Sequence, residues 1–126
     1  MTSDMQPVQL AEPAVQAGPI LDEELAMSRV GGDAELLKEL AQLFLEEYPR
    51  LMAELRQAYE QGDAKQVERS AHGLKGSVAN FGAKRAVDAA WQIEQLGRGG
   101  RLDPVAEALH SLDLLLLALH GELAQL

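Results

Sequence analysis

The sequence predicts an all-α fold, namely an up-down antiparallel four-helix bundle with an additional short N-terminal helix packed across one end. Leu and Ala dominate from Ile20 onward, whereas the alternating β-branched residues that are typical of strands are nearly absent. Residues that start and stop helices recur along the same stretch. The segments between the predicted helices are short, and short connections favour antiparallel neighbours.

The chain has 126 residues, which is the size of one compact domain. Residues 1–19 contain three prolines and one glycine without any sustained hydrophobic period, a composition typical of a flexible tail or linker. We therefore assign 1–19 to an N-terminal tail and 20–126 to the helical domain.

The first two helices are predicted from their ends. Asp22 is a candidate N-cap with two glutamates behind it, and this short helix ends at the Gly-Gly pair 31–32. The second helix begins at Asp33 and runs to about Gln61. Pro49 removes one backbone hydrogen bond inside it, so we expect one bent helix rather than two. Apolar positions at a spacing of three and four predict its core-facing side: Leu36, Leu40, Leu43, Phe44, Leu51 and Leu55.

Three further helices follow. The third begins with Asp63 as N-cap and Gln66 three residues later, a capping-box pattern, and ends near Gly82. The fourth covers about 83–96 and is followed by a glycine-rich segment. The fifth starts with Pro104 at its first helical position. Its predicted core-facing residues are Val105, Leu109, Leu112, Leu116, Leu119 and Leu123.

Charge and composition exclude several classes of function. The formal net charge of −9 argues against a nucleic-acid partner, because binding the phosphate backbone requires an excess of Lys and Arg. Without cysteine the chain has no disulfide framework and no thiolate nucleophile, which is compatible with a reducing compartment. No apolar run approaches the roughly 20 residues that cross a bilayer, and the first residues lack the features of a secretory signal. We expect a cytoplasmic protein.

The positive charges gather in one segment. Between residues 64 and 86 five basic residues accompany a single acid, Glu68, so this segment carries a charge of +4 in an otherwise acidic chain. The basic residues are Lys65, Arg69, Lys75, Lys84 and Arg85. A solvated helix face is the simpler explanation of such a cluster, but the residues between these charges favour a site for an anionic group.

His72 is predicted to face away from the core. Five apolar residues of the third helix step by four and three and form one narrow stripe: Val67, Ala71, Leu74, Val78 and Phe81. At about 100° per residue, His72 falls about 140° from the centre of this stripe. Lys65, Arg69 and Gly76 lie on the same outer face, within about 60° of His72 around the helix axis. Lys75 lies nearer the core boundary, and its long side chain can swing round toward the imidazole.

An exposed imidazole among cations suits phosphoryl chemistry. An imidazole must be neutral to attack phosphorus, and positive neighbours favour the neutral form and later stabilise the oxygens of a phosphoryl group. Gly76 costs a helix roughly 1 kcal/mol relative to alanine. Its presence one turn beyond His72 is explained if a bulky partner must approach the ring there.

The stretch from Ala71 to Ala83 reads AHGLKGSVANFGA and closely resembles the signature of histidine-containing phosphotransfer (HPt) domains. In that family the histidine is followed by a variable residue, an apolar residue, Lys, Gly and Ser, with Gly-Ala some ten positions after the histidine. The resemblance spans residue 20 to about residue 126, because the short leading helix, the Gly-Gly-Asp start of the second helix and the paired later helices also look like the family's layout. Val78 departs from the small polar residue of many members, but its spacing makes it a core residue.

The resemblance implies a phosphorelay intermediate rather than a free-standing turnover enzyme. His72 corresponds to the residue that takes a phosphoryl group from the aspartate of one receiver domain and gives it to another. Lys75 corresponds to the electrostatic helper and Gly76 to the position that leaves room for the partner. Ser77 and Asn80 also match the motif, but periodicity places them off the His72 face, so we expect helix-packing or supporting roles for them.

The partners that the resemblance implies are response-regulator receiver domains and a sensor histidine kinase, including the hybrid kind. We expect Lys65, Arg69 and Ala79 to contact the partner. The Mg²⁺ used in the transfer belongs to the acidic pocket of the receiver, so we expect no cofactor and no metal in this chain. We expect a monomer with no nucleic-acid or membrane partner of its own.

Four alternatives stay open. The bundle could dock a receiver or kinase without carrying phosphate, or accept phosphate directly from an ATP-binding kinase. A turnover enzyme is disfavoured, since no catalytic dyad, glycine-rich phosphate loop or nucleotide pocket is recognisable. A metal-binding bundle would use Glu-x-x-His pairs, and the single such pair, Glu107 and His110, faces outward. We interpret His110 and His120 as ordinary surface histidines.

Overall fold

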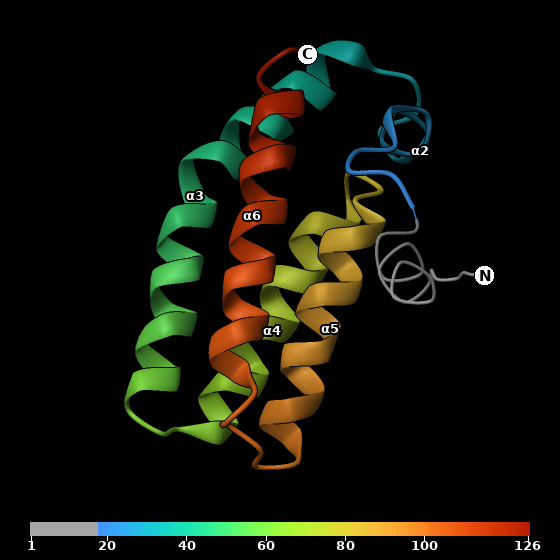
Figure 1. Ribbon diagram of the computed structural model, residues 1–126. Helices are drawn as coiled ribbons and strands as arrows, with labels where there is room; N and C mark the ends of the chain where they lie inside the picture. Colours follow the sequence, from blue (N-terminus) through green and yellow to red (C-terminus); the bar gives the residue numbers. More distant parts are fainter. Residues whose placement is uncertain (1–17) are drawn as a thin grey trace, which may run out of the picture.

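The computed structural model describes residues 18–126, which form five helices and no strand (Figure 1). The predicted all-α class is confirmed. Residues 1–17, which make up most of the predicted tail, lie outside the described residues. The helices are α2 (Glu23–Arg29), α3 (Ala34–Glu60), α4 (Ala64–Ala79), α5 (Lys84–Arg98) and α6 (Val105–Leu123).

Four of these helices form the bundle, and the short α2 lies at one end of it (Figure 1). Helix α4 packs against α3 and α5, and α6 packs against the same two helices. The connections 61–63, 80–83 and 99–104 are short, so successive helices run antiparallel, as predicted. The N–H of Asp22 donates to the carbonyl of Phe81 at 3.0 Å, which ties the start of α2 to the turn between α4 and α5.

The core contains the stripe that was predicted for α4. Its five residues, four of them in α4 and Phe81 in the turn that follows, have relative exposures of 0–3%: Val67, Ala71, Leu74, Val78 and Phe81. The six residues predicted for α6 are buried as well. Completely burying a valine or leucine side chain stabilises the fold by about 1.5–3 kcal/mol. Because only one rotation of α4 about its axis buries its four stripe residues together, the core also determines which residues of α4 face outward.

The predicted core face of α3 is wrong in the first half of the helix. Leu36, Leu40 and Leu43 are 39%, 38% and 60% exposed. Leu51 is half-buried. The predicted stripe and the buried stripe are both apolar, and in this half of the helix they are offset by one residue, or about 100° around the helix axis. Packing against α4 and α6 selects the buried stripe. The buried residues of α3 are Leu37, Ala41, Phe44, Tyr48, Met52, Leu55 and Ala58.

Three predicted aspartate caps start their helices. The side chains of Asp22, Asp33 and Asp63 accept from the backbone N–H three residues later at 3.0, 3.1 and 3.1 Å. The capping box at the start of α4 is incomplete. The side chain of Gln66 donates to the hydroxyl of Ser70 at 3.1 Å instead of returning to the cap.

The last two helices differ from their predicted bounds by one or two residues. Helix α5 continues to Arg98, beyond the predicted end at 96. Pro104 is the N-cap of α6 and not its first helical residue, because the helix begins at Val105. Pro49 lies inside one continuous α3, as predicted.

Helices α4 and α5 approach each other closely at Gly97. A Cβ atom at this position would lie 2.7 Å from the backbone N of Glu68 and 2.9 Å from the carbonyl O of Ala64. Only glycine fits this approach without a shift of the backbone. The contact therefore sets the separation at which side chains of α5 meet those of α4.

Candidate functional site

His72 lies in the middle of α4 and points outward, with 68% of its side chain exposed. Its immediate neighbour Ala71 and the residue Leu74 are completely buried, so the imidazole stands on a helix whose orientation is fixed from the opposite face. The outward direction that the periodicity predicts is therefore confirmed.

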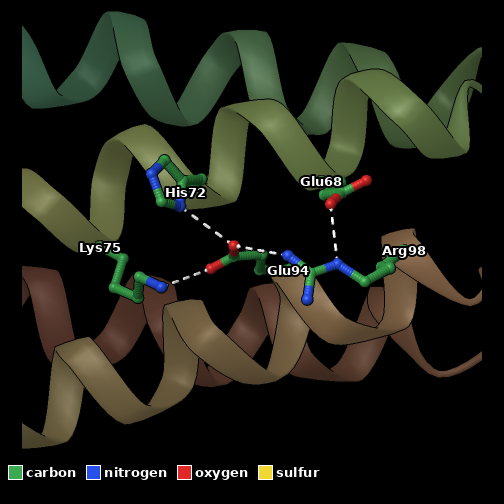
Figure 2. A network of polar contacts seen from close by, with 5 residues as sticks. All are labelled: Glu68, His72, Lys75, Glu94 and Arg98. Atoms are coloured by element: carbon green, nitrogen blue, oxygen red, sulfur yellow. Dashed lines mark hydrogen bonds and ion pairs between the residues drawn. The ribbon is translucent and has the colours of Figure 1, made fainter.

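The imidazole has a carboxylate partner that comes from another helix. Nδ1 of His72 lies 3.0 Å from Oε2 of Glu94, which is on α5 and has a side chain only 5% exposed. Figure 2 shows the two side chains pointing toward each other across the α4–α5 pair. Since a carboxylate only accepts, Nδ1 carries the hydrogen and donates it to Glu94.

Two cations hold the same carboxylate. Nζ of Lys75 lies 2.7 Å from Oε1 of Glu94, and Nη2 of Arg98 lies 3.4 Å from Oε2 (Figure 2). Nε of Arg98 also donates to Oε2 of Glu68 at 2.9 Å. The five residues form one polar network, which locks the orientation of the Glu94 carboxylate.

The network keeps Glu94 ionised although the side chain is buried. Burial by itself raises the pKa of a carboxyl group, but the contacts with Lys75 and His72 outweigh it and hold the pKa of Glu94 below its usual value. A buried carboxylate with these partners is a charged acceptor for the imidazole N–H.

This arrangement prepares the other ring nitrogen for chemistry. With the hydrogen on Nδ1, the neutral imidazole presents an unprotonated Nε2 with a free electron pair. In Figure 2 this second nitrogen lies on the side of the ring away from Glu94, Glu68 and Arg98. The site can therefore supply an exposed nitrogen nucleophile with a fixed orientation.

Gly76 leaves the surface beyond His72 open. The residue is exposed, and a Cβ atom built there would meet no atom of residues 18–126 within 4 Å, so packing among these residues does not require a glycine. Ala79, about one turn further along α4, is half-buried. The small residues at these two positions keep the helix surface low on this side of the imidazole.

On the other side of the ring lies a hollow of about 450 Å³. Two of the predicted partner contacts, Lys65 and Arg69, line this hollow. All the lining residues come from α4 and α5: Lys65, Glu68, Arg69, His72, Glu94 and Arg98. The structure thus brings Lys65 and Arg69 together with His72, as predicted, and adds Glu94 and Arg98 of α5, which were not predicted.

Glu94 and Arg98 were not predicted from the sequence. Only cations were expected around His72, and no dyad was recognisable, whereas the structure pairs the imidazole with an acid. Lys75, predicted as a helper for the phosphoryl group, is only 26% exposed and is engaged with Glu94. One signal was present in the sequence: Glu94 lies next to the buried stripe of Ala90, Ile93 and Gly97, an unusual place for an unpaired acid.

The two other histidines lie outside this site. His110 is exposed on α6. Nδ1 of His120 and the hydroxyl of Tyr48 share a hydrogen bond of 2.9 Å, so this histidine joins α6 to α3. No group of three or more His, Asp or Glu within residues 18–126 is placed to hold a metal ion.

The fold and the site define a helical-bundle protein that presents on its surface a histidine oriented by a buried carboxylate. The chain belongs to the Hpt domain family, which matches residues 39–126 and thus more than half of the chain. Histidine phosphotransfer in phosphorelays is the function of this family, and its partners are kinases and receiver domains.

Two solved structures share the fold. Histidine-containing phosphotransfer protein B (HptB) from Pseudomonas aeruginosa PAO1 aligns with a TM-score of 0.80 at 21% identity, covering 85% of this chain and 93% of its own. The HPT domain of the Hpt sensor hybrid histidine kinase from Shewanella aligns with a TM-score of 0.68 at 21% identity, covering 85% and 96%. Comparison with curated proteins gave no significant match.

Within the described part of the chain, no helix is long and apolar enough to span a bilayer.

Proposed function

We propose that His72 is the phosphoacceptor of this domain and that it shuttles a phosphoryl group between the aspartates of two receiver domains. The observation that carries the proposal is the 3.0 Å contact between Nδ1 of His72 and the buried carboxylate of Glu94. This contact assigns the hydrogen to Nδ1 and leaves Nε2 free on the exposed edge of the ring.

In the first half of the transfer, the electron pair of Nε2 attacks the phosphorus of an aspartyl phosphate. A bond between nitrogen and phosphorus forms, and the bond between phosphorus and the aspartate oxygen breaks, with its electron pair leaving on the carboxylate. Nδ1 keeps its hydrogen, and the positive charge that develops on the ring is stabilised by Glu94. In the second half an aspartate oxygen of the other receiver attacks phosphorus and forms a bond with it. The bond between phosphorus and Nε2 breaks, and its electron pair returns to Nε2, which leaves the ring neutral.

The neighbouring residues have distinct roles in this proposal. Lys75 holds Glu94 and adds positive charge beside the transferred group. Gly76 lets the receiver bring its aspartate onto the ring without meeting a side chain. Lys65, Arg69 and Ala79 are the expected contacts with the partner surface.

The proposal extends to the surroundings of the reaction. Mg²⁺ is expected in the acidic pocket of the receiver, where it would neutralise charge on the phosphoryl oxygens. We further propose that the domain acts as a monomer in the cytoplasm, in keeping with the absence of cysteine from the sequence.

The test is incubation of the wild type and of His72→Gln with receiver domains that carry aspartyl phosphate. We expect acid-labile, alkali-stable label on the wild type and none on His72→Gln. His110→Gln is the matched control, since this histidine is exposed on α6 and should leave labelling intact.

Each other outcome identifies an alternative. Label that appears only with ATP and a histidine kinase would show that the donor is a kinase and not a receiver. If several receivers and kinases bind the wild type but none labels it, the domain is a docking module. Label that persists on His72→Gln would disprove the assignment of the phosphoacceptor.

A further inference from the structure

We propose that the hollow beside His72 is a docking subsite for an acidic side chain of the receiver domain, and that Lys65 and Arg69 bind this carboxylate. The inference rests on the proposed function, because it assigns a specific contact to the same partner. It concerns recognition of the receiver and is separate from the position where phosphoryl transfer occurs.

The hollow and the reacting nitrogen lie on different sides of the imidazole. Lys65, Glu68 and Arg69 precede His72 on α4, and Arg98 faces them from α5. In Figure 2 the nitrogen that is free to react lies on the side of the ring opposite Glu68 and Arg98. A partner that engages both places therefore straddles the ring, and the hollow can hold a group that takes no part in the transfer.

Two of the cations in this region have no counterion within residues 18–126. Lys75 is engaged with Glu94, and Arg98 with Glu68 and Glu94. Among residues 18–126, neither Lys65 nor Arg69 has an ion-pair or hydrogen-bond partner through its side chain. The four cations face two carboxylates, so the region has two positive charges in excess.

Helix stability does not explain this placement. Lys65 and Arg69 are four residues apart on one helix face, where like charges repel by a few tenths of a kcal/mol, about 0.2–0.5. Lys65 also lies in the first turn of α4, which contains no acid. The helix dipole disfavours a cation at this end. Lys65 and Arg69 therefore lower the stability of α4 in the unbound protein. Their presence is explained if an external anion binds them and offsets this cost.

The receiver domain is the occupant that these charges favour. The chain has a formal net charge of −9, so an acidic partner meets attraction mainly at this segment. The hollow shares His72 with the transfer position, and one partner body that covers the ring reaches both. A carboxylate fits the cations, because the guanidinium of Arg69 can pair with both carboxylate oxygens and the ammonium of Lys65 adds a third donor.

The test compares charge-reversed variants in binding to a receiver domain that labels the wild type. In the double variant Lys65→Glu, Arg69→Glu we expect the Kd for that receiver, measured by calorimetry, to rise about tenfold, with a weaker dependence on salt. In Lys65→Gln, Arg69→Gln the rise should be about threefold. In single-turnover transfer the half-saturating receiver concentration should rise in parallel, with a much smaller change in the saturating rate.

The matched control is Arg29→Glu, Lys38→Glu. It makes the same change in net charge with one arginine of α2 and one lysine of the first turns of α3. The short α2 and the beginning of α3 lie at the other end of the bundle from the start of α4 (Figure 1). We expect less than about a twofold change in Kd. Circular dichroism checks that each variant is folded.

Several outcomes overturn the proposal. An unchanged Kd in the charge-reversed variant removes the subsite while leaving the proposed function intact, provided that the wild type is labelled. An equal loss in the control means that only net charge matters. If inorganic phosphate binds the wild type but not the variant, and receiver binding is the same in both, the hollow is a simple anion site. If no receiver labels the wild type, the proposed function and this inference fall together.

Discussion

Nδ1 of His72 lies 3.0 Å from Oε2 of Glu94, although 22 residues separate the two in the sequence. The contact orients an exposed imidazole through an acid that is itself buried and held by two cations. It therefore determines which ring nitrogen is available to a partner, and it makes Glu94 a positioning residue.

Removal of Glu94 should change the tautomer of His72. In Glu94→Ala we expect ¹⁵N NMR to show a mixture of the two neutral tautomers, and the single-turnover transfer rate to fall about tenfold, the value of one hydrogen bond to a charged group. Glu94→Gln should lose less, since its amide oxygen still accepts from Nδ1. Glu107→Gln on α6 is the control. An unaltered tautomer in Glu94→Ala would show that Glu94 has only a structural role.

The stability of the fold should depend on pH through Glu94. The pKa of this carboxyl is lowered in the folded chain, so its contribution is fully present above the ordinary carboxylate pKa of about 4.3 and is lost as the pH falls through the lower folded value. We expect the urea midpoint of the wild type to fall more steeply than that of Glu94→Gln below about pH 4. Parallel curves for the two proteins would contradict this assignment.

Lys75→Ala should slow the transfer without abolishing binding of the partner. The variant removes the 2.7 Å contact with Glu94 and a positive charge near the transferred group. It should also raise the pKa of Glu94, because a contact that lowers it is lost. Single-turnover kinetics and calorimetry separate the two effects, with Lys38→Ala as control. Loss of binding with unchanged chemistry would mean that Lys75 is a docking residue.

Gly76→Gln should block transfer while the protein stays helical. A Cβ atom at Gly76 meets nothing within 4 Å, so the side chain obstructs the partner and not the fold. Gly76→Ala should even raise the free energy of unfolding, by about 1 kcal/mol. Gly121→Gln on α6 is the matched control, because a Cβ atom there is equally unopposed. Normal transfer by a folded Gly76→Gln would refute the argument from access.

Gly97→Ala should destabilise the bundle and disturb the site together. The added Cβ atom would lie 2.7 Å from a backbone nitrogen of α4, so the helices must separate. We expect a loss of about 1–3 kcal/mol in the free energy of unfolding and a weaker His72–Glu94 hydrogen bond, visible as a change in the ¹⁵N shift of Nδ1. Gly121→Ala should instead be neutral or stabilising. A Gly97→Ala protein as stable as the wild type would show that the helices can separate without cost.

Local patterns in the sequence were sufficient to predict the helices, the buried face of α4 and the direction of His72. The aspartate caps, the helix ends and the buried stripe of α4 depend on residues within a few positions of each other, and so does the outward direction of His72. Gly76 could be placed beside His72 for the same reason. These features follow from the repeat of a single helix, which is independent of what packs against it.

Only the tertiary structure decided the partners of His72 and the exposed face of α3. Glu94 and Arg98 reach the site because α5 lies against α4 at one separation and one axial position, and no local spacing encodes these. Leu36, Leu40 and Leu43 were as apolar as the residues that became buried, so only contact between helices could select among them. Periodicity determines which side of a helix a residue occupies, whereas packing determines what that side meets.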